Sequence, residues 1–295
     1  DHAHAPAFSG TDVTYYPLGE DMFEALIPEL EQAEKFIYME YFLVSSGHMW
    51  DTILEILKRK AAQGVDVRFL YDGMNAFTNL PYGYPKELEK LGIRCKMFAP
   101  IRPFVSTHYN NRDHRKITVI DGKVGYTGGY NLADEYFHYK TLYGHWKDTG
   151  VRLEGRGVRN LTATFLELWN VNSRTEENVA PYLDVDHRVE ASGAVQPFGD
   201  SPLDGERSAE NVYLNIINQA TTSWATAGLF KTASAATIKN LTLSGGYTKL
   251  AVEPYGGMLM GSWLDRPLSI AGRVLVETDK GMQMKLVDID RDLLL

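Results

Sequence analysis

The chain has 295 residues, 44% of them hydrophobic, and a formal net charge of −8 at pH 7. This is enough apolar material for a packed core in one large or two ordinary domains. The acidic balance argues against a general nucleic-acid binder, because phosphate polyanions are usually met by a basic surface. The single cysteine excludes an internal disulfide and any cluster of thiolate metal ligands.

No stretch of the sequence reaches the roughly 18 consecutive apolar residues that a membrane-spanning helix needs. The sequence begins at Asp1 rather than at methionine. An upstream signal or membrane anchor is therefore compatible with it.

The first part of the chain alternates strand and helix patterns. Period-two and buried apolar runs predict strands at 13–18, 36–44, 65–73 and 93–99. Amphipathic runs with proline early or glycine late predict helices at 20–35, 49–64 and 85–92. A β-α-β-α-β series of this kind predicts an α/β fold with a mixed, mostly parallel sheet flanked by helices.

The remaining sequence predicts a different organisation. We expect two strands about the turn at Asp121-Gly122, a strand at 145–155 and a core helix at 158–169. Glu, Asn, Pro, Gly and Ser then become frequent, which predicts a linker. A helix at 209–220 opens a β-rich tail. The predicted domains are 1–171, a linker at 172–208, and an incomplete or chimaeric region at 209–295.

The stretch "NNRDHRKITVIDGKVGYTGGYNLADEY", residues 110–136, carries the chemistry. Residues two apart on a strand share a face, so His114 and Lys116 are expected to project together. A neutral imidazole can attack phosphorus and carry a covalent phosphoryl group. A nearby ammonium and an amide such as that of Asn131 would stabilise the oxygens as charge builds up. This chemistry requires no metal or other cofactor.

The segments "HRKITVIDG" and "TGGYN" resemble the HKD signature of the phospholipase D superfamily. Together with "MEYFLVSSGHMWDTILEILKRKAAQGVDVRFLYDG" and "GHWKDTGVRLEG", they resemble bacterial cardiolipin synthases over about residues 12–220. The resemblance implies a phospholipase D-like domain that joins two phosphatidylglycerols through a phosphohistidine and releases glycerol. It also implies a phospholipid substrate at the surface of the bacterial cell membrane, with no nucleic acid as partner.

The resemblance implies a role for five residues of the motif region. His114 is the nucleophile or its acid partner, Lys116 and Asn131 hold the phosphate, and Asp121 is the carboxylate of the motif. Asp148 is similar to the acid that orients the histidine through its other ring nitrogen. A surface ion pair is the alternative for Asp148.

Further residues are expected around the substrate. Gly128 and Gly129 either let the backbone approach the phosphate or form a tight turn. Glu40 is either a pocket group or a strand-edge residue, and Arg112 adds a cation near the phosphate. His108 and His145 are expected to support the site rather than to react.

The superfamily pattern uses two HKD motifs, and this sequence has one. The alternatives are a single-motif phosphodiesterase or nuclease completed by homodimerisation, and a non-catalytic half-protein that binds phosphate. Residues from about Gly245 are similar to a fragment of the aspartyl aminopeptidase family, yet this tail has no histidine to bind zinc. A chimaeric frame, a fusion or a divergent second domain would explain the change.

Overall fold

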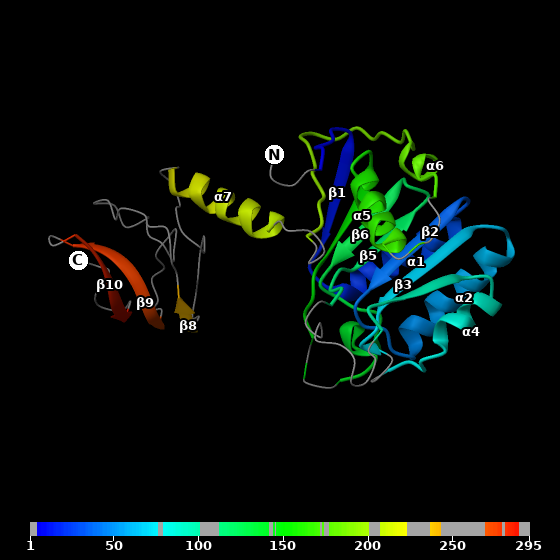
Figure 1. Ribbon diagram of the computed structural model, residues 1–295, viewed down its shortest axis with the longest axis horizontal. Coiled ribbons are helices and arrows are strands. Elements are labelled where there is room, and N and C mark those ends of the chain that lie inside the picture. Colours follow the sequence, from blue (N-terminus) through cyan, green and yellow to red (C-terminus); the bar gives the residue numbers. More distant parts are fainter. Residues whose placement is uncertain are drawn as a thin grey trace. The chain divides into compact units, whose positions relative to one another are not determined.

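The computed structural model describes residues 5–75, 79–100, 112–141, 144, 146–171, 173, 177–200 and 207–222, and three strands at 237–242, 269–278 and 281–288. The chain divides into two compact units, at 3–204 and 205–295 (Figure 1). Each unit is described by itself. Among the described helices, none is both long and apolar enough to cross a membrane.

The first unit is built on a sheet of seven strands: β1 (Thr11–Tyr16), β2 (Phe36–Tyr41), β3 (Asp66–Asp72), β4 (Arg94–Phe98), β5 (Ile117–Ile120), β6 (Val124–Gly128) and β7 (Gly150–Gly155). Their order across the sheet is β1-β7-β6-β5-β2-β3-β4. Only β2-β3 and β3-β4 are parallel pairs, and the other four of the six pairings are antiparallel. The α/β fold with a mixed sheet flanked by helices is confirmed. Most pairings are antiparallel rather than parallel, because β1 lies at the far edge beside β7 and β5-β6 is a hairpin.

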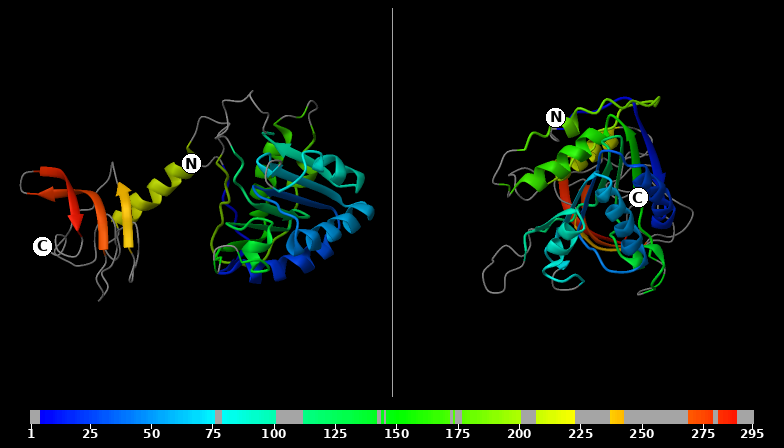
Figure 2. Two further views of the ribbon diagram at one scale, coloured as in Figure 1. Left: turned by 90° about the horizontal axis from the view of Figure 1, so that it is seen from below. Right: turned by 90° about the vertical axis from the view of Figure 1, so that its right-hand side faces the viewer.

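Helices cover both faces of this sheet: α1 (Gly19–Gln32), α2 (His48–Ala62) and α4 (Tyr84–Lys90) on one face, and α5 (Val158–Asn170) on the other (Figures 1 and 2). Strand β2 shows how the sequence builds two cores. Ile37, Met39 and Tyr41 join the core under α1 and α2, whereas Phe36 and Tyr38 join the core under α5. A strand buried on both faces is expected to be apolar nearly throughout, and in this one Glu40 is the exception.

The turn between β5 and β6 is fixed by two residues with positive φ, Asp121 at 54° and Gly122 at 67°. A type I′ turn needs positive φ at both central positions, which Asp-Gly supplies, and the Lys123 N–H closes it by donating to the Ile120 carbonyl at 3.0 Å. The buried Asp121 carboxylate also accepts hydrogen bonds from the backbone N–H groups of Glu34, Lys35 and Phe36, at 2.9, 2.7 and 2.9 Å. The hairpin is thereby fastened to the connection between α1 and β2.

We expect Asp121→Asn to lower the free energy of unfolding of the first unit by about 2–4 kcal/mol. Hydrogen bonds to a charged group are lost, and the NH₂ of the asparagine amide would face the Glu34 N–H, which is also a donor. Urea denaturation followed by circular dichroism measures this change. Asp186→Asn is the matched control, since the Asp186 side chain is 72% exposed, and should change stability by less than about 0.5 kcal/mol. Equal stability of the two variants would contradict the structural role of Asp121.

Residues 177–200, which we call the strap, fall within the predicted linker but pack on the first unit. The strap contains α6 (Ala180–Leu183). The Phe8 N–H donates to the Val195 carbonyl at 2.8 Å, and the Asn160 amide donates to the Pro197 carbonyl at 2.8 Å. The polar composition of the strap reflects its position on the surface, and its backbone hydrogen bonds, which composition does not reveal, make it part of the domain.

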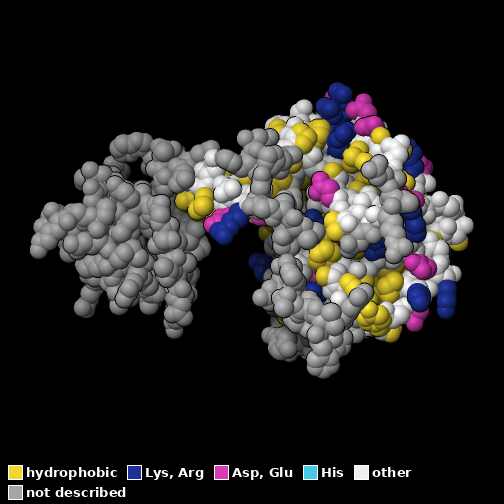
Figure 3. All heavy atoms as spheres, viewed as in Figure 1, with side chains coloured by type: hydrophobic (Ala, Val, Ile, Leu, Met, Phe, Trp, Pro, Cys, Tyr) yellow, Lys and Arg dark blue, Asp and Glu magenta, His cyan; other side chains and the backbone are white. Residues whose placement is uncertain are grey.

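Charge on the visible face of the first unit is mixed in sign. Figure 3 shows Lys and Arg side chains interspersed with Asp and Glu side chains, with no broad area of one sign on that face. Exposed pairs such as Arg188 with Asp186, at 3.0 Å, contribute at most about 1 kcal/mol each. Selection of an anionic ligand therefore depends on local geometry there.

In the second unit the structure describes helix α7 (Ser208–Thr222) and strands β8 (Thr237–Thr242), β9 (Ser269–Thr278) and β10 (Gly281–Asp288). Strand β9 is central, antiparallel to β10 and parallel to β8. The predicted helix at 209–220 and the predicted β-rich tail are confirmed by these elements.

Candidate active site

Strand register brings the predicted site residues to one edge of the sheet. Strand β5 is antiparallel to both of its neighbours, so its first residue, Ile117, pairs with Glu40 near the end of β2 and with Thr127 near the end of β6. The last residue of β6, Gly128, pairs with Gly150 at the start of β7. The segments before β5 and β7 and after β2 and β6 therefore meet at this edge.

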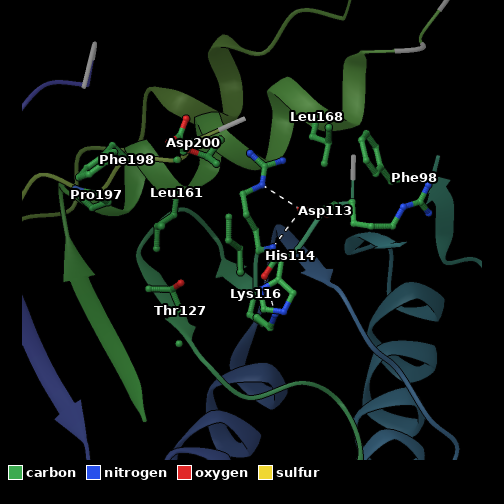
Figure 4. Close-up of a pocket in the computed structure, with 16 residues that line it drawn as sticks. Phe98, Asp113, His114, Lys116, Thr127, Leu161, Leu168, Pro197, Phe198 and Asp200 are labelled. Atoms are coloured by element: carbon green, nitrogen blue, oxygen red, sulfur yellow. Dashed lines mark hydrogen bonds and ion pairs between the residues drawn. The ribbon is translucent and has the colours of Figure 1, made fainter. Parts of the chain in front are cut away.

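His114 and Lys116 lie together before β5, and both are among the residues that line the cavity drawn in Figure 4. The Lys116 ammonium donates to the His114 carbonyl at 2.6 Å and lies 5.4 Å from the centre of the Phe42 ring. The exposed His114 ring lies 4.9 Å from the same Phe42 ring, centroid to centroid. Lys116 is only 4% exposed. Of its three donors, a single one is used within the described residues, which leaves two for an anion.

The protonation states of these two groups suit attack on phosphorus. Burial lowers the pKa of Lys116 to about 8, against the opposing effect of Asp113 and Asp148. Partial burial of the ring and the nearby Lys116 charge also lower the pKa of His114. The residue nevertheless stays accessible to solvent. At pH 7 the imidazole is therefore neutral and nucleophilic, while most of the Lys116 ammonium remains charged.

Asn131 and Asp148 reach this edge with different partners from those expected. The Asn131 amide accepts from the Leu43 N–H at 2.9 Å and donates to the Tyr136 hydroxyl at 3.0 Å. The Asp148 carboxylate accepts from the Trp146 indole at 3.1 Å. Between described residues, no hydrogen bond joins Asp148 to the His114 ring. The structure instead places Asp148 where its charge acts on Lys116.

Gly128 and Gly129 are required by close packing. A β-carbon at Gly128 would collide with the Thr149 carbonyl, and one at Gly129 would collide with the Asp148 carboxylate. Neither glycine has a positive φ, so the tight-turn alternative does not explain them. Their small size lets the end of β6 pack against the start of β7 and fixes where Asp148 lies.

A buried charged cluster lies on the α5 side of the same segment. Glu40 is fully buried, and its carboxyl group lies 2.6 Å from the Arg115 guanidinium. Burial, and then the neighbouring Asp113 carboxylate, raise the pKa of Glu40 well above its usual range. Glu40 is not among the residues that line the cavity described below, and its contact with substrate stays a prediction.

Arg112 is also bound by groups of the protein itself. Its guanidinium donates to Asp72 at 3.1 Å and to the Ala99 carbonyl at 3.0 Å. The fully buried Asp72 also accepts from the Asp113 backbone N–H at 2.9 Å. These bonds neutralise the predicted phosphate-binding cation and anchor the start of the segment that carries His114.

A cavity of about 440 Å³ lies between this segment and α5 (Figure 4). Its apolar wall includes Leu161 and Leu168 of α5, and Pro197 and Phe198 of the strap. His114, Arg115, Lys116 and Ile117 line it on the opposite side. The reactive pair is therefore part of the cavity wall.

Asp121 is not brought to this edge. It lies just beyond the opposite end of β5, roughly 20 Å along an extended chain from His114, and its carboxylate is occupied by backbone N–H groups. The structure gives this motif carboxylate an architectural position. His108 and His145 lie outside the described residues.

Sequence reasoning missed Phe42, Asp72, Asp113 and Arg115. Phe42 immediately follows β2, and Asp72 ends the parallel neighbour β3. Polar or aromatic residues at the carboxyl ends of adjacent parallel strands were the available signal, because such ends meet at one edge.

Comparison with known proteins gives two family matches. Residues 26–169 match a family described as "Cardiolipin synthase, PLD-like domain", and residues 235–295 match one described as "Aminopeptidase I zinc metalloprotease (M18)". The first match contains the whole edge described above, whereas the second falls within the tail.

Among curated relatives, an uncharacterized protein of Streptococcus mutans is 51% identical over 216 residues, covering 73% of this chain and 47% of that protein. A cardiolipin synthase of Geobacillus thermodenitrificans is 37% identical over 218 residues, covering 72% of this chain and 43% of that enzyme. The chain thus spans less than half the length of these relatives. The solved phosphatidylserine synthase of Haemophilus influenzae shares the fold, with a TM-score of 0.50 and 14% identity over 78% of this chain and 57% of that one.

Proposed function

We propose that the chain carries a phosphatidyl-transfer site with His114 as its nucleophile, because residues 26–169 match the PLD-like domain family of cardiolipin synthases. The substrate class is a phosphatidylglycerol-type phospholipid presented at a bacterial membrane surface. One phosphatidylglycerol donates the phosphatidyl group and a second accepts it.

The transfer has two steps. In the first, a ring nitrogen of neutral His114 attacks phosphorus, a P–N bond forms, and the P–O bond to the terminal glycerol breaks. In the second, a hydroxyl of another phosphatidylglycerol attacks phosphorus, the P–N bond breaks, and the new phosphodiester is cardiolipin. Each step moves one proton, first onto the leaving oxygen and then off the attacking hydroxyl.

The observation that carries the proposal is the buried Lys116 ammonium beside an accessible imidazole. Its two remaining donors can bind the non-bridging phosphate oxygens, and a buried ammonium stabilises their growing charge more strongly than an exposed one would. Among the described residues the Asn131 amide nitrogen donates only to Tyr136, so its second hydrogen can also donate to phosphate.

The leaving oxygen needs an acid that the described site does not include. His114 of a second copy, related by a twofold axis, is the symmetric candidate. A homodimer would then place one nucleophilic and one protonated imidazole on either side of a single phosphodiester.

Incubation of the chain with phosphatidylglycerol vesicles tests the proposal. We expect free glycerol and cardiolipin to form in equal amounts, as measured by enzymatic glycerol assay and lipid mass spectrometry. Phosphatidic acid in place of cardiolipin would indicate hydrolysis. Cleavage of single-stranded DNA without any lipid product would favour the nuclease alternative and contradict phosphatidyl transfer.

A further inference from the structure

The Phe42 side chain contacts both members of the reactive pair. Its ring centre lies 4.9 Å from that of His114, with an angle of 47° between the ring planes, and 5.4 Å from the Lys116 ammonium. The two contacts differ in kind. The first is a tilted ring contact, and the second is a cation–π contact, in which the ring face attracts the positive charge.

Core packing does not account for this ring. Phe42 is half-buried and belongs to neither hydrophobic cluster of the first unit, although the residue before it, Tyr41, is fully buried. The chain thus places a large apolar side chain at the edge of the sheet, where its described ring partners are His114 and Lys116.

The backbone that carries Phe42 is held by two asparagines. The Asn75 amide donates to the Phe42 carbonyl at 2.5 Å and accepts from the Val44 N–H at 2.9 Å. Asn131 accepts from the Leu43 N–H at 2.9 Å. These bonds fix the backbone of three consecutive residues, and therefore the direction in which the Phe42 side chain leaves the chain.

His114 needs such a restraint. The ring makes no hydrogen bond to Asp148 within the described part of the chain, and an exposed imidazole can exchange among several staggered rotamers. A nucleophile contributes most when it is held close to the attack geometry.

We propose that Phe42 is a positioning residue for phosphoryl transfer: its ring sets the orientation of the His114 imidazole and holds the Lys116 ammonium against it. This inference rests on the proposed function, because it assigns Phe42 a role in that reaction. Asn75 and Asn131 then act through Phe42, because they hold its backbone. Asn131 also carries a donor for phosphate, so it connects the position of the ring with phosphate binding.

Phe42→Leu tests the proposal, since it keeps an apolar side chain and removes the ring. Phe42→Tyr retains the ring and is the conservative variant. Phe8→Leu is the matched control, because the Phe8 ring lies 5.5 Å from the Arg156 guanidinium and Phe8 pairs with Val195 of the strap. Thermal unfolding identifies the folded variants, and Phe42→Met replaces Phe42→Leu if the latter fails to fold.

Two measurements on the intact chain report on the position of the His114 ring and do not require catalytic turnover. Histidine-labelled NMR follows the titration of His114, whose signal is assigned with His114→Gln. Inorganic phosphate titration measures binding at the same signal. The charged groups that act on His114 are Lys116, Asp113 and Asp72, and every variant retains them.

In Phe42→Leu we expect the pKa of His114 to rise toward its usual value, because the ring that shields it from water is gone. Phosphate affinity should fall by about threefold to tenfold, as the loss of one cation–π contact implies. Phe42→Tyr and Phe8→Leu should match the wild type in both measurements.

The outcomes separate this inference from the function on which it rests. Unchanged titration and phosphate affinity in folded Phe42→Leu would overturn the positioning role. A shifted titration in a protein that binds no phosphate in any variant would support the role of Phe42 and contradict the phosphate chemistry. Equal shifts in Phe42→Leu and Phe8→Leu would indicate a general loosening of the fold and would also overturn the proposal.

Discussion

Replacing His114 with alanine is expected to lower phosphatidyl transfer by about a thousandfold or more, because the group that forms the covalent intermediate is lost. Stability should change by less than about 0.5 kcal/mol, since the residue is exposed and its carbonyl still accepts from Lys116. Initial rates of glycerol release, together with urea denaturation, measure both effects.

His48→Ala is the matched control for this substitution. His48 is also exposed and its ring also lies against an aromatic ring, that of Tyr139, at 4.4 Å. Its removal should leave transfer within about twofold of the wild type. Similar losses in the two variants would mean that His114 is not the nucleophile.

Lys116→Met is expected to reduce transfer by about a hundredfold to a thousandfold while making the protein more stable. The rate falls because a donor aimed at the growing phosphate charge is lost. Stability rises because burying the ammonium, which lowers its pKa to about 8, costs folding free energy. The expected gain at pH 7 is on the order of 1–3 kcal/mol.

The pH dependence of this gain has a definite sign. Between pH 8 and about 10.4 the unfolded chain keeps the Lys116 proton and the folded chain loses it, so the stability of the wild type rises with pH. The advantage of Lys116→Met should therefore be full below pH 8 and disappear near pH 10.5. Urea midpoints at pH 7 and pH 10 measure it. An advantage that stays constant, or a variant less stable than wild type at pH 7, would contradict the burial cost.

Local patterns in the sequence predict most of the elements of the first unit because each pattern acts over a short range. The Asp-Gly turn needs only two residues with positive φ, and the buried β2 strand needs only its own run of apolar residues. The position of β1 was missed because it depends on pairing with β7, far along the chain. No local signal encodes that partnership.

The site residues also differ in whether a local pattern or the strand order determines their position. His114 and Lys116 were found because a two-residue spacing places them on one face. Phe42 was missed because its role depends on strand order, which brings the end of β2 beside the start of β5. Asp121 shows the opposite error, since it is close to His114 in the motif but the intervening strand carries it to the other end of the sheet.

The tail matches a different family from the first unit, with the second match beginning at residue 235. A chimaeric or fused reading frame stays our interpretation of this change, with a divergent second domain as its alternative. Sequencing of the coding region across codons 215–245 tests it, because an unbroken native frame would contradict a chimaera.

Detection of the covalent intermediate tests the central claim most directly. Brief exposure of the chain to phosphatidylglycerol, followed by rapid quenching at alkaline pH and peptide mass spectrometry, should show a phosphatidyl adduct on His114. The adduct should be labile to acid and absent from His114→Ala. A chain that produces cardiolipin while His114 stays unmodified, or that carries the adduct on another residue, would contradict the account.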